Sequence, residues 1–242
     1  MDPSAQQPDT RGGDLPPTAV VMPVYNEAAV VRRVIAELVE LGLTVIAVDD
    51  GSSDDSAAEI DAAGAIRVSH PINLGQGGAL QTGFTAALRF TDAKYVATFD
   101  ADGQHQARDL LGMIAKAEEG YDVVLGSRFL DGKTEMSGLR RIILKTATKV
   151  LNRRSATKLT DAHNGLRLMT RDVVARIDLV HMGMAHASEL EQVLTQADHR
   201  VTEYPVHILY TDYSRSKGQP LLNSVNILVD ILFHRVSTWS RR

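Results

Sequence analysis

Two aspartates one residue apart are the side chains of this chain best suited to bind a metal ion. Asp100 and Asp102 lie in the segment 100–105, Asp-Ala-Asp-Gly-Gln-His, directly after a short apolar run. Together with the amide of Gln104 they offer three oxygen ligands, which suit a hard cation such as Mg²⁺ or Mn²⁺. The Asp102-Gly103 pair also fits a plain turn, because aspartate is common in turns for its own hydrogen bonds. On this motif alone both interpretations stay open.

Another aspartate pair and a group of glycines form further candidate ligand contacts. Asp49 and Asp50 stand before the turn-forming segment 51–54, and Gly75 and Gly77 lie in a glycine-rich segment. Asp50 is suited to accept a hydrogen bond from a nucleobase imide or a ribose hydroxyl, although a helix-capping turn without a ligand would use the same residues. The glycines allow close backbone approach, but their spacing is not that of the dinucleotide fingerprint.

Basic residues are concentrated in one part of the chain. Residues 128–167 contain ten Lys and Arg against three acidic residues, a local charge of +7, whereas the whole chain carries −4. Such an excess is typical of contact with a phosphate, lipid head groups or another anion, with a solvated helix face as the alternative. Arg215 and Lys217 are either solvated loop charges or cations that stabilise a leaving diphosphate.

The elements that must position these residues follow from the hydrophobic pattern. Short apolar runs alternate with amphipathic stretches, of which residues 30–39 show helical spacing, and this rhythm predicts an α/β fold with a mostly parallel sheet. Ligands bind such sheets at the carboxyl ends of the strands, where the polar motifs of this chain stand. The apolar runs expected to form strands are residues 19–24, 43–48, 65–68, 95–99 and 122–125.

We expect three segments along the chain. Residues 1–17 read as a flexible tail without the apolar core of a signal peptide, and residues 18–218 as a single α/β domain. Residues 219–242 carry apolar residues at helical spacing and end in Trp239, Arg241 and Arg242, which fits a helix packed on the core or one lying in a membrane interface. The amphipathic stretch 139–151 leaves the same two alternatives open.

Composition excludes several classes of protein. The chain has no cysteine, so disulfides, thiolate catalysis and cysteine-based metal sites are excluded, and a cytoplasmic location is the expectation. No apolar run reaches the roughly 18 residues that a membrane-spanning helix needs, so we expect at most a peripheral position on the cytoplasmic face. An aromatic content of 5% argues against nucleic-acid binding.

Taken together, the motifs resemble those of family 2 glycosyltransferases of the GT-A fold, and within them the polyprenyl-phosphate and dolichyl-phosphate sugar transferases. The resemblance runs from about Val20 to Lys217, and five or more motifs in the same order make chance agreement implausible. Where the lipid-phosphate enzymes typically have a serine before a glycine, this chain has Asn164. The motifs are residues 23–27, 49–54, 73–79, 100–105, 126–128, 161–167 and 216–217.

The resemblance implies a role for each group of residues. The donor would be a nucleotide-diphosphate sugar, either a UDP-sugar or a GDP-sugar. Its diphosphate would bind through the metal at Asp100, Asp102 and Gln104, with Ala101 between them, and under Arg215 and Lys217. Arg128 would face the phosphate of the acceptor, and Asp161 and Arg167 would line the acceptor side. The nucleoside would be held by Pro23, Tyr25, Glu27, Asp49 and Asp50.

These roles imply inverting transfer by a single displacement, in which the metal acts as a Lewis acid on the leaving diphosphate. A lipid-phosphate acceptor is already anionic and needs no strong base, and the local charge of +7 favours it. A glycan or protein hydroxyl would need a carboxylate base, for which Asp161 is the candidate. A catalytically silent nucleotide-sugar-binding subunit, acting through a small membrane protein, is the remaining alternative. The complete set Asp100, Asp102 and Gln104 argues against it.

Overall fold

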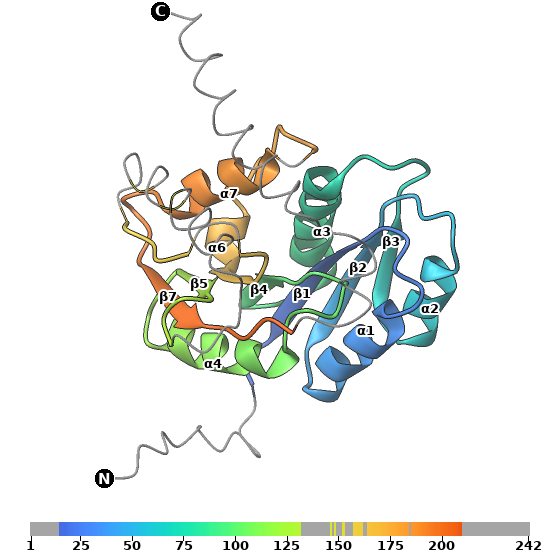
Figure 1. The fold of residues 1–242 in the computed structure, drawn as a ribbon, viewed down its shortest axis with the longest axis horizontal. Coiled ribbons are helices and arrows are strands. Elements are labelled where there is room, and N and C mark those ends of the chain that lie inside the picture. Colours follow the sequence, from blue (N-terminus) through green and yellow to red (C-terminus); the bar gives the residue numbers. More distant parts are fainter. Residues whose placement is uncertain are drawn as a thin grey trace, which may run out of the picture.

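Seven strands form one sheet with helices on both faces, in a computed structural model that describes residues 15–131, 146, 148, 152, 157–161, 164–183 and 185–209 (Figure 1). The strands are β1 (Thr18–Val24), β2 (Thr44–Asp49), β3 (Ile66–Ser69), β4 (Tyr95–Thr98), β5 (Val123–Ser127), β6 (Arg167–Thr170) and β7 (Val201–Pro205). The helices are α1 (Val31–Glu40), α2 (Ser56–Ala62), α3 (Gln76–Phe90), α4 (Ala107–Glu118), α6 (Arg171–Val174) and α7 (His186–Leu194).

The sheet has the order β3-β2-β1-β4-β6-β5-β7 and is parallel except for β6. The mostly parallel α/β sheet expected from the sequence is therefore confirmed, and its five expected strands are present with ends shifted by one or two residues. Strands β6 and β7 were not expected. Because β6 is antiparallel to β4 and β5, its first residue, Arg167, lies toward the same edge of the sheet at which its neighbours end.

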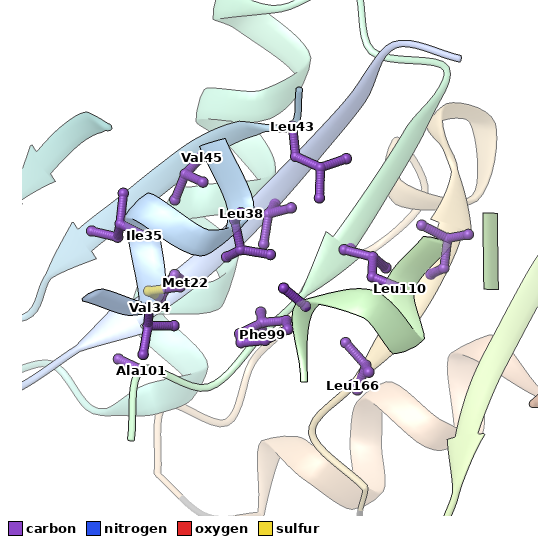
Figure 2. Close-up of a cluster of buried hydrophobic side chains, with 14 of the residues drawn as sticks. Met22, Val34, Ile35, Leu38, Leu43, Val45, Phe99, Ala101, Leu110 and Leu166 are labelled. Carbon is purple, nitrogen blue, oxygen red and sulfur yellow. The ribbon is translucent and has the colours of Figure 1, made fainter. Parts of the chain in front are cut away.

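One face of the sheet is covered by α1, α2 and α4 (Figure 1). The helical spacing expected over residues 30–39 produces α1, which buries Val34, Ile35 and Leu38 against the sheet. Figure 2 shows these side chains packed beside Met22 of β1, with Leu110 of α4 in the same cluster. Phe99 and Ala101 also belong to this cluster, so the segment that carries the metal-binding candidates is anchored in the core.

The other face is covered by α3, α6 and α7 (Figure 1). Leu80 and Phe84 of α3 pack with Leu190 and Leu194 of α7 and with Met169 of β6 in a second buried cluster. The N-terminal ends of α3 and α7 also lie close together, since a Cβ added at Gly77 of α3 would be 2.7 Å from Cβ of His186, the first residue of α7.

Several expectations fall on residues that the structure does not describe. These are most of the N-terminal tail, the C-terminal helix expected over residues 219–242, the cations Arg215 and Lys217, and nearly all of the stretch 139–151. Within the described ranges, no helix is both long and apolar enough to cross a membrane.

Candidate active site

The loops that follow β1, β2, β3 and β4 are joined by hydrogen bonds at the carboxyl edge of the sheet. The N–H of Asn26 donates to Ser52 Oγ at 3.0 Å, and Gln76 at the start of α3 donates to Asp100 Oδ1 at 3.2 Å. Between them, Asp50 accepts from the backbone of the loop before α3. Motifs far apart in the sequence therefore form one continuous rim, as the parallel sheet predicts.

Asp50, after β2, joins its loop to the loop between β3 and α3. Its Oδ1 lies 2.7 Å from His70 Nδ1 and accepts from the N–H of Leu74 at 2.9 Å, and its Oδ2 accepts from the N–H of Gly75 at 2.8 Å. His70 Nε2 in turn lies 2.9 Å from Thr82 Oγ1 on α3. A carboxylate offers about four acceptor positions. Three of them are filled in Asp50, which leaves one on Oδ2 for a ligand.

The other candidate nucleoside contacts surround Asp50. Tyr25 is half exposed at the end of β1 and Pro23 is partly buried beneath it. Glu27 is partly buried, and its charge is close enough to raise the pKa of Asp102. Asp49 is buried and accepts from the N–H of Ser52 at 3.0 Å, so it shapes the loop after β2.

Gly75 and Gly77 are both approached closely by the loop before α7, although their N–H groups have different partners. The N–H of Gly75 donates to Asp50, whereas the N–H of Gly77 donates to Met182 O at 2.8 Å. A Cβ at position 77 would lie 2.1 Å from His181 O and 2.7 Å from His186 Cβ. The close approach that the sequence suggested at Gly77 is thus made by the loop before α7 and by the first residue of that helix.

The metal-binding candidates lie together after β4. Asp100 Oδ2 lies 3.2 Å from His105 Nε2, and both oxygens of Asp102 accept from Gln104, from its N–H at 3.0 Å and from its Nε2 at 2.7 Å. Gln104 therefore presents its amide nitrogen to Asp102 in this arrangement, and its oxygen becomes a ligand only when the amide turns over. Ala101 is buried between the two aspartates.

The electrostatics of this pair fit a divalent cation. Burial raises the pKa of Asp102, and the negative charges of Asp100 and Glu27 raise it further. Burial also acts to raise the pKa of Asp100, but the hydrogen bond from His105 and the charge of Arg167 hold it below its usual value. Two crowded carboxylates are relieved by a bound cation, and a hard cation prefers oxygen ligands. No cluster of three or more His, Cys, Asp or Glu suited to a metal occurs among the described residues.

Arg128 and Asp161 form a buried ion pair at the end of β5. Arg128 donates to Asp161 Oδ2 through its N–H at 3.0 Å and through Nε at 2.6 Å, and to Oδ1 through Nη2 at 2.7 Å. Glu203 of β7 fixes the same turn, because it accepts from the N–H groups of Thr160 and Asp161. Both carboxylate oxygens of Asp161 therefore accept hydrogen bonds from Arg128, whereas a general base needs a carboxylate oxygen that is free to accept a proton.

We expect Asp161→Asn to lower the free energy of unfolding by about 3–5 kcal/mol, because it turns an amide toward Arg128 and leaves a buried guanidinium partly uncompensated. Asp61→Asn is the matched control, since Asp61 and Arg67 form a similar two-pronged pair at 2.8 and 3.0 Å on the surface. Urea denaturation of both variants measures the difference. Equal losses in the two variants would contradict a special cost at the buried pair.

Sequence reasoning missed several residues of the rim. His70 follows β3 directly, so the rule that strand ends carry the site could have found it. Gln76 stood in the motif 73–79 without a role of its own, and nothing in the local sequence singled out His186. His105 stood in the metal motif without a role, and the structure places it against Asp100. Of the ten cations in residues 128–167, the structure describes only Arg128, Lys158 and Arg167.

Residues 19–178 match the model of a protein family described as glycosyl transferase family 2. The match covers more than half of the chain and includes the rim loops after β1 to β5. The chain belongs to glycosyl transferase family 2. It is therefore a glycosyltransferase, and its sheet is the GT-A fold of this family.

Two curated relatives of this glycosyltransferase cover most of its length. An uncharacterized protein of Methanocaldococcus jannaschii is 30% identical over 224 residues, which are 90% of this chain and 91% of the relative. The undecaprenyl-phosphate 4-deoxy-4-formamido-L-arabinose transferase of Shewanella sediminis is 31% identical over 230 residues, 88% of this chain. This chain spans 65% of the length of the Shewanella enzyme.

Solved structures of glucosyl-3-phosphoglycerate synthase from Mycobacterium tuberculosis share the fold. The complex with phosphoglyceric acid has a TM-score of 0.68 at 19% identity, covering 90% of this chain and 79% of the synthase. The complex with Mn²⁺, UDP and glucosyl-3-phosphoglycerate has a TM-score of 0.67 at 18% identity, with the same coverage. At this level of identity, the similarity establishes the arrangement of sheet and helices.

Proposed function

We propose that this glycosyltransferase moves a sugar from a UDP-sugar to a polyprenyl phosphate, with Mg²⁺ or Mn²⁺ and inversion at the anomeric carbon. The observation that carries the proposal is the rim itself. It brings the crowded carboxylates Asp100 and Asp102 beside a nucleoside-binding candidate, Asp50, and it engages Asp161 with Arg128. The family membership supplies the reaction class, and the named relatives point to the acceptor.

The remaining acceptor position of Asp50 supports a uracil base. Uracil presents one ring N–H between two carbonyl groups, so a single carboxylate lone pair satisfies it. Guanine presents a ring N–H beside an amino group, and a carboxylate binds that edge best with both oxygens free. Oδ1 of Asp50 is already filled by His70 and Leu74, which favours UDP over GDP. One of the synthase complexes that share this fold contains UDP.

The metal site would be formed by Asp100, Asp102 and Gln104. A cation bound there acts as a Lewis acid on the leaving diphosphate. His105 and Gln76 orient Asp100, and Gln104 orients Asp102. Arg215 and Lys217 remain our candidates to cover the diphosphate, because the transition state builds negative charge on it.

The engaged state of Asp161 supports a phosphate acceptor. A hydroxyl acceptor must lose a proton to a base, whereas a phosphate monoester is already anionic and attacks without one. The Shewanella relative is named for an undecaprenyl phosphate, which has this chemistry. Arg128, held by Asp161, would then face the acceptor phosphate, and the enzyme would work at a membrane surface on the cytoplasmic side, helped by residues 219–242.

A transfer assay tests the proposal. Radiolabelled UDP-sugars and GDP-sugars are incubated with the full chain, Mn²⁺ and undecaprenyl phosphate in anionic liposomes, and the products are extracted with an organic solvent. We expect label in the organic phase with a UDP-sugar and none after chelation of the metal. When the liposomes are collected by centrifugation, we expect the full chain to sediment with them. A variant that ends at residue 218, assayed in parallel, should stay in solution.

Three results would redirect the proposal. Label that moves to a water-soluble glycan or protein would establish a hydroxyl acceptor. Preference for GDP-sugars would contradict the count of acceptor positions on Asp50. Donor binding without turnover to any acceptor would favour the silent-subunit alternative.

A further inference from the structure

Arg167 is a buried cation that has no hydrogen-bonding partner among the described residues. The residue is 6% exposed, and none of the described residues brings a carboxylate oxygen within 4.0 Å of its guanidinium or accepts a hydrogen bond from it. Burial lowers its pKa, while the charges of Glu191, Asp100 and Asp161 raise it from a greater distance. The guanidinium nitrogens do not belong to the fully buried polar atoms without a partner in the described part of the chain, so a ligand can reach them and accept their hydrogen bonds.

The position of Arg167 points it toward the rim. It begins β6, opposite Thr98 of β4 and Leu125 of β5. Alternate residues of a strand face the same side of a sheet, so Arg167 shares the side of Met169, which packs in the cluster formed by α3 and α7. The guanidinium therefore lies between the sheet and these two helices, near Asp100.

His186, the first residue of α7, adds a hydrogen-bond acceptor to the same place. It is 3% exposed, and its Nδ1 lies 2.8 Å from Gly183 O. A carbonyl oxygen only accepts, so Nδ1 carries the hydrogen and Nε2 of the neutral ring carries a lone pair. Burial lowers the pKa of His186, and the charge of Arg167 lowers it further, which keeps the ring neutral. Within the described part of the chain, Nε2 has no hydrogen-bond partner.

Arg167 lies on the side of Asp100 away from the nucleoside candidates Tyr25 and Asp50, and His186 lies beside Gly77 at the start of α3. The order of the sheet places β1 and β2, with Tyr25 and Asp50, on one side of β4, and it places β6, with Arg167, on the other. Both Arg167 and His186 act electrostatically on Asp100, and Gln76 bridges from α3 to Asp100 Oδ1. A donor whose diphosphate is held at Asp100 and whose base lies near Asp50 must extend its sugar in this direction.

We propose that Arg167 and His186 bind hydroxyl groups of the transferred sugar and select an uncharged sugar. The assignment rests on the proposed donor. A hydroxyl oxygen accepts from Arg167, and its hydrogen is donated to His186 Nε2, so one polyol satisfies both. A sugar carboxylate lacks that hydrogen and would face the negative charge of Glu191. The subsite therefore favours a neutral hexose over a uronic acid.

Binding calorimetry with Mn²⁺ tests the subsite by comparing UDP, UDP-glucose and UDP-glucuronic acid. Loss of a hydrogen bond to a charged group costs about 10- to 100-fold in affinity. We expect Arg167→Gln and His186→Gln each to weaken UDP-glucose at least about 10-fold and to leave UDP unchanged. In the unaltered enzyme, UDP-glucose should bind more tightly than UDP-glucuronic acid. Thermal unfolding of each variant verifies that it is folded.

Matched controls lie just beyond the same strand and helix, away from the rim. Arg171, after the far end of β6, donates to the carbonyls of Leu88 and Thr91, and His199 lies beyond the other end of α7 with its side chain 5% exposed. Arg171→Gln and His199→Gln should leave the ratio of UDP-glucose to UDP affinity unchanged.

Different results would overturn the sugar subsite, the preference for a neutral sugar and the proposed donor. Equal weakening of UDP and UDP-glucose by Arg167→Gln and His186→Gln, or no weakening of either, would overturn the sugar subsite while leaving the proposed donor in place. Tighter binding of UDP-glucuronic acid would overturn the preference for a neutral sugar. Absence of UDP binding by the unaltered enzyme would overturn the proposed donor, and the subsite with it.

Discussion

Replacing Asp102 by alanine is expected to abolish sugar transfer at every concentration of Mn²⁺ or Mg²⁺. Asp102 is one of only two carboxylates in its loop, and both of its oxygens are oriented by Gln104. Burial raises the pKa of Asp102, and repulsion from Asp100 and Glu27, which a bound cation would relieve, raises it further. Lewis-acid catalysis is worth several kcal/mol, so we expect a loss of about a thousandfold or more.

Mn²⁺ binding separates this role from a loss of structure. Electron paramagnetic resonance of the Asp102→Ala variant with UDP should show free Mn²⁺ where the unaltered enzyme shows bound ion. Asp92→Ala is the control, because Asp92 is an exposed residue just before β4 and the same side chain is lost. Full activity of Asp102→Ala would refute the metal assignment.

The second large effect is expected from replacing Gly165, which is not itself a metal ligand. A Cβ added at Gly165 would lie 2.1 Å from Asp100 Oδ2 and 2.8 Å from its Cγ. The backbone at Gly165 cannot easily shift away from Asp100, because Gly165 O accepts a hydrogen bond from Thr98 Oγ1 at 2.6 Å. Asp100 would have to turn away and lose its contacts with His105 and Gln76. We therefore expect Gly165→Ala to weaken Mn²⁺ about 10- to 100-fold, as other losses of ligand orientation do.

Activity of Gly165→Ala should fall together with metal affinity and should recover in part when Mn²⁺ is raised, which distinguishes it from Asp102→Ala. Gly183→Ala is the matched control, because a Cβ at that glycine meets nothing within 4 Å. A Gly165→Ala enzyme with unchanged Mn²⁺ affinity would show that Asp100 is not held by the turn before β6.

The sequence predicted those features of the fold that depend on residues close together in the chain. Apolar runs predict strands, and parallel strands require that their carboxyl ends share an edge, so the motifs at residues 49–54 and 100–105 could be placed on one rim without coordinates. The short strand β6 could not be found in this way. It follows residues 161–165, which read as a binding motif, and its direction depends on pairing with strands that are distant in the chain.

The partners of the site residues were also beyond the sequence. Asp50 was expected to be free for a ligand, but His70, Leu74 and Gly75 fill three of its acceptor positions. Arg128 and Asp161 were given separate roles and instead bind each other across 33 positions of the chain. A sequence shows which groups can donate or accept, whereas tertiary packing decides which of them meet.

The antiparallel direction of β6 also bears on how the enzyme can change in evolution. Strand β5 ends at Ser127 and β6 begins at Arg167, and the two strands are paired at Leu125 and Arg167. The chain therefore leaves the sheet and returns to it at neighbouring points of one edge. Closing such a loop costs only about 0.6 kcal/mol more for each doubling of its length. The chain between Arg128 and Asp161 can thus change in length between relatives, while the Arg128–Asp161 pair and the contact of Gly165 with Asp100 stay in place.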